Sequence, residues 1–289
     1  MDSAGAVAPV KPLTKSPSRA TETRRHGGLQ DFGLRASVSP WFVIIALAVL
    51  LAGSGTLHAQ RGGGRGGPPP AAREAAALDL TGYWVSVINE DWKWRMVTPK
   101  KGVYDSLPLN AEARKVADSW DPARDETAGE QCRAYGAANV MRLPGRLHIS
   151  WEDANTLRID TDAGTQTRLL RFGTAAAAAP GEPSWQGHSI AEWEFGGGGR
   201  GGQARTGNVK VVTSNLRPGY VRKNGAPYSQ KTVVTEYYDL NTAPNGDQWM
   251  TVTTKVEDPV YFNRYYLTTS DFKKLPNAVG WNPTPCSSR

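Results

Sequence analysis

The chain has 289 residues, and 34 Lys and Arg against 27 Asp and Glu give it a formal charge of +7. Residues 1–59 hold six of the basic and three of the acidic side chains, so the remainder carries only about +4. This near balance excludes the broad basic surface that is typical of nucleic-acid-binding domains, and we expect no nucleic-acid partner.

Residues 1–59 are typical of a signal peptide. A basic flank precedes an uncharged apolar run at 41–53, which is shorter than the about 20 residues of a membrane-spanning helix. Leu57-His58-Ala59 forms a cleavage site, so we expect the mature chain to begin at Gln60. The alternative is an uncleaved anchor, and membrane contact is then expected only through this segment. Both alternatives place the main domain outside the cytoplasm. After cleavage it is expected in the periplasm or secreted, and with an uncleaved anchor it is expected to be tethered to the membrane.

Residues 60–77 are rich in Gly, Pro and Arg and predict a linker. Residues 78–289 have the length and apolar content of one globular domain with its own core.

Within this domain, alternating apolar and polar residues predict ten strands. They lie at 78–88, 92–97, 146–151, 155–161, 166–172, 189–195, 208–215, 231–239, 248–257 and 264–272. Turn residues at 152–155 and 245–247 predict hairpins, and the Gly/Arg tract at 196–202 predicts a hairpin insertion. Asn110 is expected to cap a helix at 111–120, with a further helical turn at 125–131.

The pattern predicts an all-β domain of about ten antiparallel strands with one short helix, as a barrel or a sandwich. Gly82-Tyr83-Trp84 resembles the Gly-x-Trp opening of lipocalin-type barrels. The alternative role of Trp84 is that of an ordinary core tryptophan.

Two cysteines, Cys132 and Cys286, lie in the expected domain. In an oxidising compartment an even pair without a CxxC motif is most simply one disulfide, which would pin the C-terminal tail to the body. Metal ligation and a reactive thiol are the weaker alternatives.

The segment Gly187-His188-Ser189, followed by Trp193-Glu194, begins a series of motifs in the second half of the domain. An apolar strand at 209–212, the run 234–238 (VTEYY) and the pair Asp258-Pro259 complete the series. In these motifs the chain resembles a group of exported bacterial proteins of unknown function. It departs from them by the inserted tract at 196–202 and by Ala191-Glu192 in place of Gly-Arg. The resemblance implies export and a β-rich fold, and it implies no activity.

His188 is the first candidate site residue, because a His-Ser pair near Glu192 and Glu194 invites acid–base chemistry. Adjacent strand residues point to opposite faces, however, so His188 and Ser189 cannot form a direct couple. The same alternation places Trp193 on the face opposite Glu192 and Glu194, where we expect it to be buried. The hydrolase motif Gly-x-Ser-x-Gly and the zinc motif HExxH are missing.

Glu236 is the second candidate, on one face of its strand with Tyr238. If this face is inward, the carboxylate needs a cation such as Arg142, Arg158 or Arg168. An outward position beside a basic residue is the alternative.

Three function hypotheses follow. The first is a non-enzymatic barrel that binds a small-molecule or carbohydrate ligand through His188, Glu236, Trp84, Trp193 and Tyr238. The second is a hydrolase-like enzyme that uses His188 with Glu192 or Glu236. The third is a structural or interaction protein of the cell envelope. The sequence indicates no cofactor and no metal site.

Overall fold

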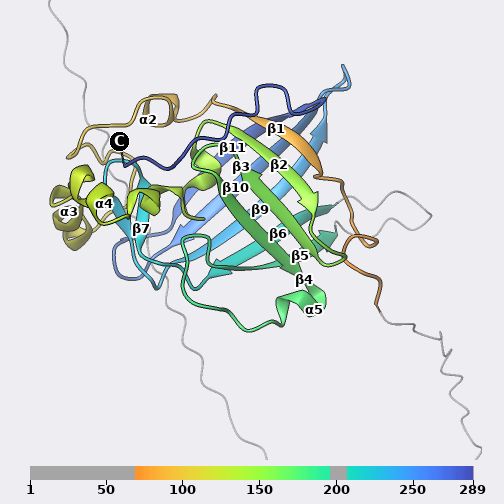
Figure 1. The fold of residues 1–289 in the computed structure, drawn as a ribbon, viewed down its shortest axis with the longest axis horizontal. Coiled ribbons are helices and arrows are strands. Elements are labelled where there is room, and N and C mark those ends of the chain that lie inside the picture. Colours follow the sequence, from red (N-terminus) through yellow and green to blue (C-terminus); the bar gives the residue numbers. More distant parts are fainter. Residues whose placement is uncertain (1–68, 196–206, 289) are drawn as a thin grey trace, which may run out of the picture. The chain divides into compact units, whose positions relative to one another are not determined.

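The computed structural model describes residues 69–195 and 207–288 (Figure 1). The expected signal peptide, the first part of the expected linker and the tract at 196–202 lie outside these described residues. Every described helix and strand belongs to one compact unit, Gly66–Arg289.

Nine strands of the described residues close a barrel (Figure 1). Each barrel strand pairs with the barrel strand that precedes it and with the one that follows it in the chain, and β11 pairs with β1, so the sheet leaves no open edge. Of the two predicted architectures, the barrel is the one that forms. The order around it is β1 (Gly82–Val87), β2 (Arg146–Trp151), β3 (Thr156–Thr161), β4 (Gln166–Phe172), β5 (His188–Phe195), β6 (Gly207–Ser214), β9 (Val233–Thr242), β10 (Gln248–Glu257) and β11 (Tyr266–Leu275), which returns to β1.

One pair of barrel strands is parallel, which corrects the prediction of a wholly antiparallel sheet. Strand β4 runs parallel to β5, with Leu170 opposite Ser189 and Phe172 opposite Ala191. An odd number of strands in a closed ring cannot alternate in direction throughout, so one neighbouring pair must be parallel. The connection between them, which holds the short helix α5 (Gly173–Ala176), carries the chain back to the end where β4 began.

The predicted strand at 92–97 is wrong. Its residues form the one-turn helix α2 (Trp92–Arg95) instead, entered through Asp91 with a φ of 51°. A strand with this alternation would bury the face that carries the tryptophan side chains, whereas Trp92 is exposed and Arg95 is buried. Tertiary contacts of the Arg95 side chain decide this segment, because it pairs with Glu90 and donates to the Arg142 carbonyl oxygen.

Apart from α5, the helical segments of the described residues lie between β1 and β2. They are α2, α3 (Ala111–Asp118), α4 (Pro122–Thr127), and the 3-10 turns η1 (Gln131–Tyr135) and η2 (Val140–Arg142). The predicted helix is confirmed as α3, with the Asn110 side chain accepting a hydrogen bond from the Ala113 amide. A second, unpredicted excursion between β6 and β9 forms the hairpin of β7 (Gly219–Arg222) and β8 (Ala226–Tyr228). We call these two excursions, residues 88–145 and 215–232, the cap, because they gather at one end of the barrel (Figure 1).

Three apolar clusters form among the described residues, and the two larger ones make up most of the core. The first fills the barrel and includes Trp84, Ile159, Leu170, Tyr238 and Phe272. The second joins the cap to the barrel through members such as Leu109, Ala113, Tyr228, Val234 and Tyr266. The cap is therefore packed firmly on the barrel end, and residues within it hold defined positions.

The predicted disulfide is confirmed. Cys132 in η1 is bonded to Cys286, with 5.1 Å between their Cα atoms. The C-terminal segment also bonds to the β3–β4 turn, where the Thr284 amide donates to the Asp162 carbonyl oxygen over 2.8 Å. The disulfide thus ties the end of the chain to the cap.

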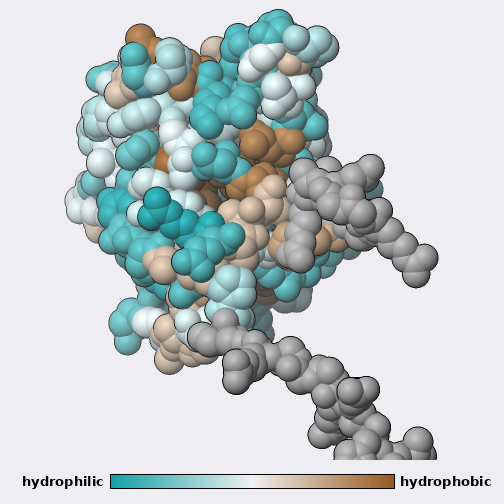
Figure 2. Space-filling view, turned by 90° about the vertical axis from the view of Figure 1, so that its right-hand side faces the viewer, coloured by the Kyte–Doolittle hydropathy of each residue, from teal (hydrophilic) through white to brown (hydrophobic). Residues whose placement is uncertain are grey.

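The opposite end of the barrel faces the viewer in Figure 2, where apolar side chains gather near the centre of the view. Partly buried residues packed against the barrel core include Leu78, Trp151, Trp193 and Leu240. Residue Ala72, within the range expected to be linker, is buried here and its amide bonds to the Asn155 side chain over 2.8 Å.

Candidate functional site

The predicted candidates on β9 point into the barrel. Glu236 and Tyr238 are both 0% exposed, as is Trp84 on β1. Of the cations considered as partners of Glu236, Arg168 on β4 is the one that the fold supplies. Its guanidinium is fully buried and forms a two-bond pair with the carboxylate, with distances of 2.8 and 2.5 Å.

Further polar groups complete this buried network. The Arg168 guanidinium also lies 3.4 Å from the Tyr238 hydroxyl and 3.4 Å from Thr213 Oγ1, which in turn bonds to Ser189 over 2.8 Å. Burial opposes the charge of Arg168, but the adjacent Glu236 carboxylate outweighs this and raises the pKa of the guanidinium. The pair links β4 to β9 inside the barrel, and Arg168 Nε is the one guanidinium nitrogen that has no hydrogen-bond partner among the described residues.

Trp84 and Trp193 have structural contacts. The Trp84 indole donates to the Leu80 carbonyl oxygen over 2.8 Å inside the barrel core, which is the core role that the sequence left open. Trp193 lies on the inward face as expected, but it is half-buried at the barrel end instead of fully buried. Its ring stacks on Phe172 at 5.1 Å, and its indole donates to the Ala72 carbonyl oxygen.

The structure does not join His188 to either carboxylate of the hydrolase hypothesis. His188 is buried at the start of β5, and among the described contacts no hydrogen bond or ion pair links it to Glu192 or Glu236. Glu192 pairs on the surface with Lys210 at 2.8 Å, and Glu236 is held by Arg168. The geometry therefore supplies no acid–base pair around His188.

In the part of the chain that the structure describes, His188, Glu236, Trp84, Trp193 and Tyr238 line none of the five best-formed pockets. The described residues also hold no cluster of three or more His, Cys, Asp or Glu side chains able to bind a metal ion. No helix among them is long and apolar enough to cross a membrane.

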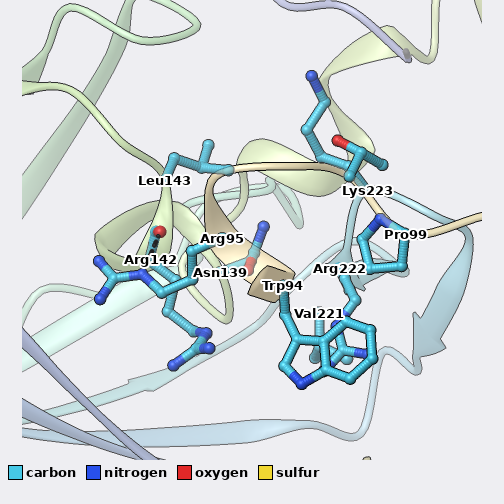
Figure 3. A pocket seen from close by; sticks show the side chains of 10 residues that line it. Trp94, Arg95, Pro99, Asn139, Arg142, Leu143, Val221, Arg222 and Lys223 are labelled. Carbon is cyan, nitrogen blue, oxygen red and sulfur yellow. Dashed lines mark hydrogen bonds between the residues drawn. The ribbon is translucent and has the colours of Figure 1, made fainter. Parts of the chain in front are cut away.

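A different site lies in the cap, where three arginines surround a small cavity of about 30 Å³ (Figure 3). Arg95 comes from α2, Arg142 from η2 and Arg222 from β7, so three separate segments build it. All three side chains are at least nine-tenths buried. The other lining residues are Trp94, Thr98, Pro99, Asn139, Leu143, Val221 and Lys223. In Figure 3 Lys223 extends away from the arginines. We call this cavity the arginine pocket.

Two carboxylates hold two of the arginines. Arg95 pairs with Glu90 at 2.6 Å, and Arg142 pairs with Asp91 at 2.9 Å. Arg222 donates hydrogen bonds to neutral groups, namely the Asp105 carbonyl oxygen and Ser106 Oγ. The three guanidinium groups thus have two carboxylates as direct partners, and Asp271 adds a negative charge that acts on Arg95 from farther away.

The hydrogen-bonding capacity of the arginines is also incomplete. Arg95 Nη2 and Arg142 Nη1 are buried and have no hydrogen-bond partner among the described residues, and Glu90 Oε2 lacks one as well. Burial lowers the pKa of Arg95 and of Arg222, and burial raises the pKa of Glu90. Keeping these groups charged therefore costs desolvation free energy, and a bound group that accepts hydrogen bonds from the arginines would reduce that cost.

Sequence analysis missed this pocket, although it named Arg142 as a partner for Glu236. Arg95 lay in a segment predicted as a strand, and Arg222 lay in a hairpin that no alternation revealed. The pocket exists only because the folded cap brings these segments together.

Comparisons of the chain with protein-family models, with curated proteins and with solved structures find no match. The geometry of the site is therefore the basis for the function.

Proposed function

We propose that this protein is an exported β-barrel binding protein whose ligand carries an anionic group, and that the arginine pocket in the cap holds this group. The observation that carries the proposal is the pair of buried, unpartnered guanidinium nitrogens, Arg95 Nη2 and Arg142 Nη1, in a cavity where Arg222 donates only to neutral groups.

A buried donor without an acceptor costs about 1–3 kcal/mol, and more when it belongs to a charged group. Arg95 Nη2 and Arg142 Nη1 are two such donors in one cavity, and an acceptor bound there would satisfy both. Carboxylate and phosphate oxygens suit the planar fork of a guanidinium and form short, charge-assisted bonds with it.

The size of the cavity limits what enters it. A volume of about 30 Å³ exceeds the roughly 10–15 Å³ that one water requires, and it accepts a few ligand oxygens but no complete small molecule. We infer that the pocket takes the anionic group while the rest of the ligand stays outside. A second pocket is lined by Asp91 and Ser106, which bond to Arg142 and Arg222 respectively. It offers Pro108, Tyr265 and Leu267 for the remainder of the ligand.

The barrel serves as a rigid support in this proposal. Its interior is filled by the Arg168–Glu236 network and apolar side chains, so binding occurs on the cap that it carries. Export and location outside the cytoplasm are part of the proposal, and the Cys132–Cys286 disulfide is the feature of the fold that supports them.

The test is calorimetric titration of the protein with inorganic phosphate and with acetate as probes, at matched ionic strength. We expect one saturable site for at least one probe. Arg142→Gln removes a charged donor and should weaken that binding by about 10–100-fold. Arg171→Gln, on the barrel wall, is the matched control and should leave the affinity unchanged.

Absence of binding by both probes would overturn the proposal, as would equal affinity in the wild-type and Arg142→Gln proteins. Because Arg142 also pairs with Asp91, thermal unfolding of the variant must first show a folded protein. Asn139→Ala removes a neutral lining group without breaking an ion pair, and it provides a second variant for the same measurement.

A further inference from the structure

The outer side of the segment that lines the arginine pocket exposes three large apolar side chains. Trp92 is 64% exposed, Met96 58% and Val97 69%, all within six residues of one another. The inner side of the same segment is anchored, because Arg95 is buried and paired with Glu90. The apolar side chains are thus presented outward by a segment with a fixed inner side.

Basic residues accompany these apolar side chains. Lys93, Lys100 and Lys101 are exposed, and residues 92–101 contain no Asp or Glu. The preceding carboxylates, Glu90 and Asp91, are already bound to Arg95 and Arg142. The outer surface of this segment is therefore both apolar and positively charged. We call residues 92–101 the Trp92 segment.

We propose that the Trp92 segment contacts the surface of an anionic lipid membrane. This contact is independent of the ligand proposed for the arginine pocket, and it adds to any contact made by the N-terminal apolar run.

The size and chemistry of the surface favour a membrane over a protein partner. A specific protein interface buries at least about 1,000 Å² with a well-packed centre, which three side chains of one short segment cannot provide. Membrane attachment requires less, because Trp and aliphatic side chains enter the headgroup region while lysines stay at the surface. Each basic residue near an anionic membrane strengthens binding by roughly fivefold.

The test uses the full chain with a single fluorescent label. Both native cysteines are in the disulfide, so Val97→Cys introduces the one free thiol for an environment-sensitive fluorophore such as NBD. The matched control is Val279→Cys, since Val279 is also apolar and 56% exposed but lies outside the segment. Because the label reports its own surroundings, attachment through the N-terminal run does not produce the response at position 97.

With vesicles of equal phosphatidylglycerol and phosphatidylcholine, the label at position 97 should shift to shorter wavelength and the label at 279 should not. Replacing Lys93, Lys100 and Lys101 by Gln should raise the lipid concentration for half-maximal response on the order of 100-fold. Trp92→Ser in the Val97→Cys protein should reduce the response further, while Arg171→Gln on the barrel wall should leave it unchanged.

Three results would overturn the proposal: no shift at position 97, an equal shift at position 279, or an equal shift with phosphatidylcholine alone. A shift caused by soluble glycerol phosphate without vesicles would also contradict it, because it would place a free anion at the segment. Failure here leaves the phosphate and acetate titrations of the arginine pocket unaffected, so the two proposals fail separately.

Discussion

Removal of the carboxylate from the barrel centre should destabilise the protein severely. In Glu236→Ala the Arg168 guanidinium, which is 0% exposed, loses both of its short bonds and keeps only contacts of 3.4 Å with Tyr238 and Thr213. Breaking a buried ion pair in this way costs about 3–5 kcal/mol, because the remaining charge stays buried without a counter-charge. That is a large part of the about 5–15 kcal/mol by which domains are stable.

The double variant Arg168→Met/Glu236→Leu separates charge burial from packing. Replacing both partners by apolar side chains of similar volume removes the stranded charge, so most of the stability should return. The single and double variants form a thermodynamic cycle whose coupling free energy measures the pair directly. Urea unfolding followed by circular dichroism supplies the free energies, with a common slope as the check on two-state behaviour.

Glu192→Ala is the matched control, since its carboxylate also pairs with a cation on a neighbouring strand but lies on the outer surface. Its unfolding midpoint should stay within experimental error of the wild type. The reasoning is refuted if Glu236→Ala costs less than about 1 kcal/mol, or if the double variant is as unstable as the single one. Either result would return Glu236 to consideration as a ligand-binding residue.

Three further predictions concern other parts of the fold. Cys132→Ser should lower the free energy of unfolding by about 3–5 kcal/mol, because the disulfide closes a loop with a sequence separation of 154. Cys286→Ser removes the same bond and should cost the same amount, so unequal losses in urea titrations would contradict this prediction. Gly187→Ala should lower the free energy of unfolding by about 2 kcal/mol or more, since the φ of Gly187 is +61° and a Cβ there would lie 2.4 Å from a backbone oxygen of β6. A Cβ at Gly181 meets open space, so Gly181→Ala should leave the thermal unfolding midpoint unchanged. Burial raises the pKa of Asp160, but hydrogen bonds from an arginine and a threonine lower it by more, so the folded pKa lies below the unfolded value. Its stabilisation is then present above about pH 4 and is lost as the pH falls through the folded pKa, and Asp160→Asn should show a smaller loss of stability on acidification.

Strands with one buried face were the most predictable part of the structure. Segments 146–151, 166–172 and 248–257 form β2, β4 and β10 with the predicted bounds. Apolar and polar residues alternate throughout β2, and in β4 and β10 most of the residues on the buried face are apolar. The N-cap at Asn110 was equally predictable from the sequence, since the start of a helix depends on hydrogen bonds made within a few residues.

Sequence alternation failed where distant contacts outweigh local preference. At 92–97 the pattern favoured a strand, but the pairing of Arg95 with Glu90 and with the Arg142 carbonyl oxygen holds a helical turn. Strands β7 and β8 are buried on both faces and carry glycine and proline, so they gave no alternation to detect. The parallel β4–β5 pair follows from closing an odd number of strands, which depends on the whole barrel.

The sequence by itself determined the features that rest on local pattern and on composition. These are the β-rich domain, its main hairpins, the α3 helix and the pairing of the two cysteines that have no other partner. The tertiary structure alone decided what the polar residues do. Whether Glu236 faced inward, and which arginine met it, depended on strand order around a closed barrel, which no single strand encodes. The arginine pocket depended likewise on three segments meeting in the cap, because a guanidinium becomes a binding group only when burial removes its water and leaves its donors without partners.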